Sequence, residues 1–274
     1  MSGRIRVCLA GATGWVGRGL SGEIAAAPDL ALTGAVARTA AGRPLGEVLG
    51  DARIGVATSG TVAEALAAGA DVFVDYTSAA AVRAHVETAI DAGVSVVVGS
   101  SGLNDEEYAA IDRRARERGV GVLAAGNFAL TAVLLQRFAE IAARLVPQWE
   151  IIDYARASKP DAPSGTAREL AARLAGVRAP QLAVPIDGTI GPKEARGATL
   201  GGMQMHSVRL PGFVSSIEVL FGLPDERLSI RHDSGAGAGP YIAGTLLAIR
   251  RVGGFTGLRR GLDTVMELEG ARMP

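Results

Sequence analysis

The sequence begins with an apolar segment that leads directly into a row of closely spaced glycines. Residues Ile5–Ala10 have the length and apolar character of a buried β-strand, and Gly11, Gly14 and Gly17 follow where a helical pattern starts. A strand that passes through a tight glycine turn into a helix is typical of a strand–helix–strand unit, whose two strands are parallel. The start of the chain therefore predicts an α/β fold built on a parallel sheet.

The same alternation continues through the first half of the chain. Apolar runs of strand length are separated by segments with the spacing of amphipathic helices. This pattern predicts a Rossmann-like, doubly wound parallel sheet with right-handed crossovers. The expected strands are Ile5–Ala10, Leu30–Val36, Val72–Val74, Val94–Val98 and Val120–Ala124, and the expected helices are Val16–Ala27, Val62–Ala68, Ala79–Ala92 and Asp105–Arg118.

After Asn127 the pattern changes, which indicates a second domain. We assign residues 1–127 and 240–274 to the first domain, and residues 128–239 to an α+β domain with a mixed or antiparallel sheet. One helix of the second domain is expected to open with the capping-box pattern Thr166-Ala167-Arg168-Glu169. The expected elements are the helices Ala129–Leu145, Thr166–Leu174, Tyr241–Val252 and Gly257–Glu267, the long loop Pro185–Gly202, and the strands Glu150–Ala155, Met203–Leu210, Ser215–Gly222 and Glu226–His232.

Composition narrows the functional classes. The 28 basic and 28 acidic residues cancel, so charge favours neither nucleic acid nor an anionic membrane as a partner, and a small molecule is the better expectation. No signal peptide or membrane span is recognisable, which favours the cytoplasm. The single cysteine, Cys8, lies in an apolar strand, which excludes a disulfide framework and a cysteine-rich zinc site. We expect no metal, because no His/Asp/Glu cluster has ligand spacing.

The three glycines have the positions that a phosphate-binding turn requires. Gly11 allows the tight turn, Gly14 lets the backbone approach a pyrophosphate, and Gly17 lets the helix pack closely. The N-terminus of the helix then presents its N–H groups to the anion. Because the turn follows the first strand of an α/β pattern, it predicts a dinucleotide site rather than a purely structural turn. The same segment contains Thr13, Trp15 and Val16.

The residues after the second strand indicate which dinucleotide binds. Sites selective for NAD usually place Asp or Glu there to bind the ribose hydroxyls, whereas this strand ends in Ala37 and Arg38. The guanidinium of Arg38 could pair with a 2′-phosphate through two hydrogen bonds. We therefore expect NADPH, with NADH possible if Arg38 is only a solvated surface residue.

A lysine and two hydroxyl residues surround the expected start of a helix in the second domain. Backbone amides at such a start bind anions, so Ser164, Gly165 and Thr166, with Lys159 upstream, suit a substrate carboxylate. Lys159 would supply positive charge and a proton. The residues alone are equally consistent with Thr166 only capping the helix and Lys159 being solvated.

The segment Lys159–Thr166 reads Lys-Pro-Asp-Ala-Pro-Ser-Gly-Thr, and shorter motifs accompany it along the chain. Together these segments resemble the 4-hydroxy-tetrahydrodipicolinate reductase (dihydrodipicolinate reductase) family, whose hallmark segment ends K-x-D-A-P-S-G-T. The resemblance runs almost from end to end. The shorter motifs are Asp75-Tyr76-Thr77, Gly99-Ser100-Ser101-Gly102, Gly126-Asn127-Phe128, His206-Ser207-Val208-Arg209 and Glu226–His232.

By that resemblance, the chain is expected to transfer hydride from NAD(P)H to a cyclic imine dicarboxylate in lysine and diaminopimelate biosynthesis. The resemblance also implies that the second domain binds the substrate and assembles a homotetramer. Thr77 is implied to lie near the cofactor ribose. The residues implied to line the nicotinamide pocket are Gly99, Ser100, Ser101, Gly126, Asn127 and Phe128, and those implied to hold the substrate are Lys159, Ser164, Gly165 and Thr166.

Two departures from the family pattern affect the expected substrate site. The family usually has a His-His pair before the hallmark lysine, and Ala155 and Arg156 occupy those positions here. Arg156 can bind a carboxylate but cannot donate a proton near neutral pH, so Lys159, Tyr154 or a water would donate it. The family's S-S-R-x-x-F stretch is replaced by Ser234–Tyr241, which contains no arginine.

The three histidines do not replace the missing pair in an obvious way. His85, on an amphipathic helix, and His232, at a strand end, are expected to be structural. His206 lies three residues before Arg209 in the second domain, and it is a candidate substrate ligand. A hydrogen-bonded structural role is the alternative for His206.

Other functions are compatible with parts of the sequence. A related reductase acting on a different imine or enamine would fit Ala155 and Arg156, and a non-catalytic NADPH sensor would fit the missing histidines. A semialdehyde dehydrogenase needs a cysteine nucleophile, which Cys8 cannot supply. A short-chain dehydrogenase needs Tyr-x-x-x-Lys on a helix, and Tyr154 and Lys159 do not have that spacing.

Overall fold

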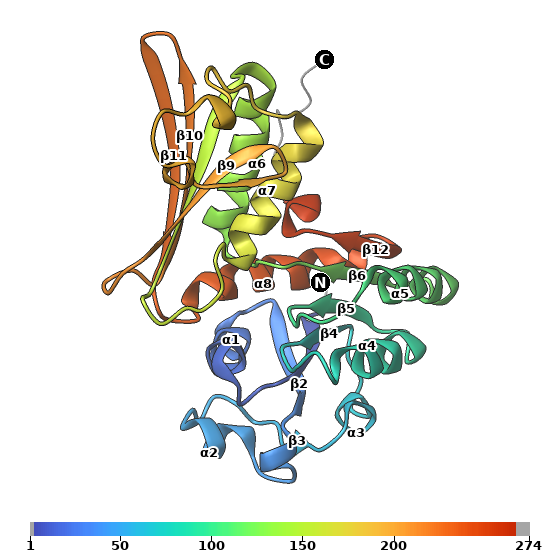
Figure 1. Ribbon diagram of the computed structural model, residues 1–274. Helices are drawn as coiled ribbons and strands as arrows, with labels where there is room; N and C mark the ends of the chain where they lie inside the picture. Colours follow the sequence, from blue (N-terminus) through green and yellow to red (C-terminus); the bar gives the residue numbers. More distant parts are fainter. Residues whose placement is uncertain (1–2, 267–274) are drawn as a thin grey trace. The chain divides into compact units, whose positions relative to one another are not determined.

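The computed structural model describes residues 3–266, which form two compact units (Figure 1). The first unit contains the chain up to Leu130 together with the chain from Ala238 on, and the second unit is Thr131–Gly237. Each unit has its own sheet and its own hydrophobic core. The second unit is therefore an insertion between two segments of the first.

The first unit is built on a seven-stranded sheet in the order β12-β6-β5-β4-β1-β2-β3 (Figure 1). All of its strand pairs are parallel. From β1 the chain first builds one side of the sheet and then the other, so the sheet is doubly wound and its switch point lies between β1 and β4. This confirms the predicted Rossmann-like fold class. The strands are β1 Ile5–Ala10, β2 Leu30–Val36, β3 Thr58–Ser59, β4 Val72–Asp75, β5 Ser95–Val98, β6 Gly121–Ala124 and β12 Gly257–Arg260.

The helices of the first unit begin and end where local chemistry favours it. In α5, the Asn104 side chain accepts from the Glu107 N–H, and the Glu107 side chain accepts from the Asn104 N–H. These two hydrogen bonds form a capping box. Gly119 ends the same helix in the left-handed conformation. The valines and alanines of the strands pack against the apolar faces of α3, α4 and α5. The helices are α1 Trp15–Ala26, α2 Leu45–Leu49, α3 Val62–Leu66, α4 Val82–Asp91, α5 Asp105–Arg118 and α8 Gly239–Arg251, with short 3-10 helices η1 Arg38–Ala40, η4 Val252–Gly254 and η5 Leu262–Val265.

The second unit has a five-stranded sheet in the order β11-β10-β7-β9-β8. The pair β7 and β9 is parallel and the other pairs are antiparallel, so the sheet is mixed. Trp149 and Ile151 of β7 pack with Leu170 and Leu174 of α7 in the core. The elements are α6 Leu130–Leu145, β7 Gln148–Ala155, α7 Gly165–Val177, η2 Ile186–Gly188, η3 Lys193–Arg196, β8 Ala198–Leu200, β9 Met203–Arg209, β10 Ser215–Leu223 and β11 Glu226–Ser234.

Two predicted segments are wrong. The expected helix Gly257–Glu267 is instead the edge strand β12 followed by the short η5, and Glu267 lies outside the described residues. Leu258, Leu262 and Val265 have helical spacing, but the Leu258 N–H bonds to Asp112 Oδ1 and the segment pairs with β6. The expected loop Pro185–Gly202 is not wholly irregular, because it contains η2, η3 and β8.

Candidate functional site

The glycine turn between β1 and α1 is too crowded for side chains. Gly11 has φ +80°, and a Cβ on Gly17 would lie 2.0 Å from the Gly11 carbonyl oxygen. The Gly14 N–H donates to that same oxygen at 2.8 Å. Because the N-cap of α1, Gly14, has no side chain to cap the helix, the first N–H groups of α1 can donate to an anion. Thr13 lies in the turn and Val16 in the first turn of α1, and Trp15 is 61% exposed beside the ring of Tyr241.

Replacing Gly17 with alanine is expected to weaken NADPH binding about 10- to 100-fold, because a methyl group in a filled site costs about 1–3 kcal/mol and the backbone must move to accept it. Gly22→Ala, in the same helix, is the matched control, since its Cβ would meet the nearest side-chain atom at 3.4 Å. Fluorescence titration with NADPH measures both variants. Equal affinities for the two variants would contradict a role of Gly17 in shaping the turn.

Arg38 lies directly after β2, as the first residue of η1. Its side chain is exposed, and within residues 3–266 it has no recorded ion pair or hydrogen-bond partner. The neighbouring Ala37 N–H donates to the Ser59 carbonyl, which fixes the backbone at this point. The guanidinium is therefore available to a ligand at the end of β2.

A buried carboxylate organises the carboxyl ends of β4 and β5. Asp75 is fully buried and accepts hydrogen bonds from the Thr77 hydroxyl at 2.8 Å, the Ser100 hydroxyl at 2.5 Å and His85 Nδ1 at 2.8 Å. Burial acts to raise the pKa of Asp75, but the bonds from His85, Ser100 and Thr77 outweigh it and hold that pKa below its usual value. Two predicted cofactor residues, Thr77 and Ser100, are thus brought together.

Two of the other residues predicted near the nicotinamide lie against the ring of Tyr76. A Cβ on Gly99 would lie 2.2 Å from that ring, and the ring of Phe128 meets it edge-on at 6.0 Å. Asn127 Oδ1 accepts from the Ala129 N–H, while Ser101 and Gly126 are exposed. The Phe128 side chain is 2% exposed, and its place beside the nicotinamide remains a prediction.

In the second unit, the Lys159–Thr166 segment leads into the start of α7. Ser164 is the N-cap, and its hydroxyl accepts from the Ala167 N–H, so the predicted capping box at Thr166 is wrong. The Ser164 hydroxyl accepts in the helix cap and keeps its own O–H as a donor, and its assignment to the substrate site remains a prediction. Gly165 and Thr166 occupy the first helical positions, where N–H groups have no partner within the helix.

Lys159, upstream of this helix start, forms an ion pair with an acidic neighbour. Its Nζ lies 2.7 Å from Asp161 Oδ1, and this bond lowers the pKa of Asp161. An ammonium has three N–H donors, so Lys159 can also bind a ligand. The Lys159 N–H donates to the Arg156 carbonyl, which places both residues in one turn, and Arg156 itself is exposed.

A buried ion pair between Asp153 and Arg209, which the sequence analysis did not predict, holds the Lys159–Thr166 segment by hydrogen bonds. Asp153 Oδ2 accepts from the Ser164 N–H at 2.8 Å and from Arg209 Nη2 at 2.7 Å. Arg209 Nη2 also donates to the Asp161 carbonyl at 2.8 Å. The pair thus fixes two points of the segment. The sequence feature that could have indicated this ion pair is the aspartate within the apolar strand segment Ile151–Ala155.

His206 does not lie with these residues. It pairs with Ile152 across β7 and β9, and its Nε2 bonds to Glu150 Oε2 at 2.7 Å, on the opposite sheet face from Asp153. Tyr154 is also on that face, where its hydroxyl donates to Glu218. His206 and Tyr154 thus lie on the opposite sheet face from Asp153, and their roles as substrate ligand and proton donor remain predictions.

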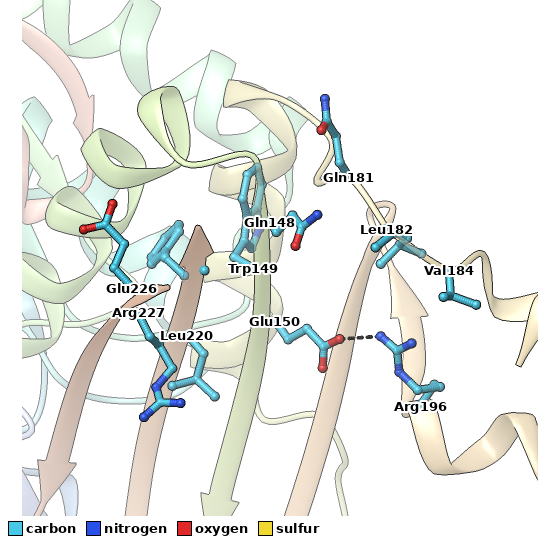
Figure 2. Close-up of a pocket in the computed structure, with 13 residues that line it drawn as sticks. Gln148, Trp149, Glu150, Gln181, Leu182, Val184, Arg196, Leu220, Glu226 and Arg227 are labelled. Atoms are coloured by element: carbon cyan, nitrogen blue, oxygen red, sulfur yellow. Dashed lines mark hydrogen bonds and ion pairs between the residues drawn. The ribbon is translucent and has the colours of Figure 1, made fainter. Parts of the chain in front are cut away.

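The face that carries His206 adjoins a hollow of about 470 Å³ at the ends of β7 and β10 (Figure 2). Glu150 points toward Arg196 there, and the two form an ion pair of 2.6 Å. The lining contains none of the site residues expected from the sequence. It is formed by Gln148, Trp149, Glu150, Gln181, Leu182, Ala183, Val184, Arg196, Leu220, Phe221, Gly222, Glu226 and Arg227.

Among residues 3–266, no group of three or more His, Cys, Asp or Glu side chains could hold a metal ion. Within the same range, each helix is too short or too polar to cross a membrane.

The third histidine, His232, lies in the second unit. His232 Nδ1 lies 3.0 Å from the Thr131 hydroxyl, and burial lowers the pKa of His232.

Comparison with known proteins identifies the family. Residues 5–128 match the model of the dihydrodipicolinate reductase N-terminus, and residues 131–266 match that of the dihydrodipicolinate reductase C-terminus. The chain belongs to the dihydrodipicolinate reductase family. Membership in this family makes it an NAD(P)H-dependent oxidoreductase, as the glycine turn and the resemblance predicted.

Individual members of the dihydrodipicolinate reductase family match over nearly the whole chain. The 4-hydroxy-tetrahydrodipicolinate reductase of Moorella thermoacetica is 39% identical over 269 residues, which are 97% of this chain and 100% of that protein. The Halalkalibacterium halodurans enzyme of the same name is 43% identical over 197 residues, covering 72% and 74% of the two chains. A dipicolinate-bound dihydrodipicolinate reductase structure from Paenisporosarcina sp. TG-14 superimposes with a TM-score of 0.84 at 29% identity, covering 96% and 100%.

Proposed function

We propose that this reductase converts 4-hydroxy-tetrahydrodipicolinate to tetrahydrodipicolinate with NADPH, in lysine and diaminopimelate biosynthesis. The observation that carries the proposal is the Lys159–Thr166 segment, in which an ammonium group precedes the first turn of α7, where the N–H groups of Gly165 and Thr166 have no partner within the helix. Such a site suits a carboxylate. A structural relative has dipicolinate, an aromatic dicarboxylate, bound to it, which supports a substrate of this chemical class.

The first unit has the features that a dinucleotide requires. NADPH, when bound, supplies the hydride. The uncapped start of α1 would hold the pyrophosphate, and Arg38 the 2′-phosphate. Thr77 would contact the ribose. The residues proposed to surround the nicotinamide are Gly99, Ser100, Ser101, Gly126 and Asn127, with Phe128 contributing packing from the core.

The second unit would bind the carboxylates and supply a proton. The N–H groups of Gly165 and Thr166 would bind one carboxylate together with Lys159, and Arg156 would bind a second. The 4-hydroxyl of the substrate must leave as water to give the conjugated imine, and hydride addition to that imine must then be balanced by a proton. Lys159 is the proposed donor, because Arg156 stays charged and Ala155 has replaced a histidine.

A coupled assay tests the proposal directly. A synthase generates fresh substrate, and oxidation of NADPH is followed by absorbance. We expect turnover well above the background rate. Normal NADPH binding with background turnover would contradict the proposed substrate.

Two observations favour a second candidate, a reductase of the same family that acts on a different imine. Ala155 is 1% exposed and has no ionisable group, and Arg156 is the exposed residue beside it. The stretch 234–241 also contains no arginine. Each change alters groups that would contact carboxylates or donate a proton. Screening cyclic imines and enamines that carry a single carboxylate distinguishes this candidate from the first.

Substituting Arg38 tests the choice of cofactor. Arg38→Ala is expected to lower kcat/KM with NADPH about 10- to 100-fold, because charge-assisted hydrogen bonds to a 2′-phosphate contribute about 1.5–3 kcal/mol. The value with NADH should change by less than about twofold, because NADH lacks that phosphate. Arg43→Ala, at an exposed residue after η1, is the control. A wild-type protein that strongly prefers NADH would contradict the assignment.

We also propose a cytoplasmic homotetramer. The support is the sheet face of the second unit that carries Ile152, Val208 and Leu220, each partly exposed and turned away from the core between the sheet and α7. A partner subunit on this face would bury that apolar area. Light scattering measures the molar mass, and a monomer at assay concentration would contradict the tetramer.

A further inference from the structure

Asp75 lies at the centre of the parallel sheet, at the end of the strand next to the glycine turn. Its strand, β4, pairs with β1 on one side and with β5 on the other. The Asp75 carbonyl accepts from the Gly99 N–H at 2.9 Å, which joins the ends of β4 and β5. Carboxyl ends of strands at such a switch point are where open α/β sheets bind ligands.

The carboxylate of Asp75 joins two loops by direct hydrogen bonds. The Thr77 N–H at 3.1 Å and the Thr77 hydroxyl at 2.8 Å both donate to Oδ1, and the Ser100 hydroxyl donates to the same oxygen at 2.5 Å. The Thr77 N–H also donates to Ser100 Oγ at 2.7 Å. Thr77 follows β4 and Ser100 follows β5, so one buried group fixes both loops.

His85 completes the arrangement from helix α4. Its Nδ1 lies 2.8 Å from Asp75 Oδ2 and is the donor, since an ionised carboxylate can only accept. Among the recorded contacts of the described chain, His85 is the single basic partner of Asp75. The charge is therefore stabilised mainly by hydrogen bonds.

The orientation of the two hydroxyl groups follows from this chemistry. Because Asp75 cannot donate, the hydroxyl protons of Thr77 and Ser100 must both point toward it. Both residues are partly exposed, so their remaining oxygen lone pairs are available to a ligand. The two side chains are presented as hydrogen-bond acceptors. A ligand group that donates N–H or O–H bonds is complementary to them.

We propose that Asp75 is a positioning residue that holds Thr77 and Ser100 as acceptors for the N–H or O–H donors of the nicotinamide riboside end of the cofactor. The proposal rests on the proposed placement of the dinucleotide at this sheet edge. Asp75 itself is fully buried, so it would act only through these two side chains. Its effect is confined to the nicotinamide half of the molecule, and the adenosine half binds independently of it.

The test compares two ligands on the Asp75→Asn variant. NADPH contains the nicotinamide riboside, whereas 2′,5′-ADP contains the adenosine and the 2′-phosphate without it. An amide can donate as well as accept, so asparagine at position 75 no longer requires the hydroxyl protons of Thr77 and Ser100 to point toward it. We expect the Kd for NADPH to rise about tenfold and the Kd for 2′,5′-ADP to change by less than about twofold.

Asp112→Asn is the matched control. Asp112 also joins two elements of the first unit, since its carboxylate accepts from Leu258 N–H and Arg116 Nε, and it has no part in the proposed site. This variant should leave both affinities unchanged. An unchanged NADPH affinity in Asp75→Asn, or an equal weakening of both ligands, overturns the proposal.

Thr77→Val covers the case in which Asp75→Asn fails to fold. Valine keeps the volume of the side chain and removes one outward acceptor, so NADPH should again weaken selectively relative to 2′,5′-ADP. Unchanged NADPH affinity in this variant overturns the proposal. If the wild-type protein binds neither ligand, this result contradicts the proposed cofactor site, and it therefore also contradicts the inference about Asp75.

Discussion

Replacing Lys159 with alanine is expected to lower kcat/KM for the imine about a thousandfold while the Kd for NADPH changes by less than about twofold. A positioned proton donor contributes about 10²- to 10⁴-fold to a rate, and the ammonium also binds a carboxylate in the proposed site. Lys159 belongs to the second unit, whereas the dinucleotide features lie in the first. Steady-state kinetics and NADPH fluorescence titration measure the two quantities.

The chain offers a closely matched control for this experiment. Lys193 is the only other lysine, and it also forms an ion pair with an aspartate, Nζ to Asp187 Oδ1 at 2.8 Å. Lys193→Ala therefore removes the same side chain and the same type of contact outside the proposed site. Its kcat/KM should stay within about twofold of wild type. A Lys159→Ala variant as active as Lys193→Ala would refute the assigned role of Lys159.

Replacing Arg209 with alanine is expected to reduce the free energy of unfolding by about 3–5 kcal/mol, because removing one partner of a buried ion pair leaves the other charge uncompensated. Asp153 would keep its buried carboxylate and lose the bond of 2.7 Å from Arg209 Nη2. The Asp161 carbonyl would lose its donor at the same time. Urea unfolding followed by the fluorescence of Trp149, which lies in the core of the second unit, measures the effect there.

Two further variants make the Arg209 result specific. Arg231→Ala removes an arginine on the same sheet whose partner, Asp233, is exposed, and this should cost at most about 1 kcal/mol. The double variant Asp153→Asn with Arg209→Met removes both buried charges, so it should recover much of the lost stability. Its KM for the imine should remain raised, because the Lys159–Thr166 segment has lost its support. A single Arg209→Ala variant as stable as Arg231→Ala would show that the pair is not important for stability.

The parts of the fold that depend on local pattern could be predicted from the sequence. The glycine turn and the alternation of strands with helices each involve neighbouring residues, and the structure has both. Strand β12 could not be recognised in the same way. Leu258, Leu262 and Val265 have the spacing of a helix face, and the strand forms only because β6 offers an unpaired edge.

The candidate sites were predicted less completely, because their buried carboxylates act over long sequence distances. Arg209 and Asp153 are 56 positions apart, and Ser100 and Asp75 are 25 apart, so no local pattern links them. The sheet face that His206 occupies could have been predicted. His206 and Arg209 are three positions apart on one strand, and side chains an odd number of positions apart point to opposite faces of a sheet.

The insertion of the second unit has a consequence for synthesis of the chain on the ribosome. Strand β6 ends at Ala124, but its neighbour β12 starts only at Gly257, after the whole second unit has been translated. Until then the nascent sheet has an open edge of apolar strand at β6, which is the kind of surface that pairs with other chains. We expect this edge to be covered only when β12 has been made and pairs with β6.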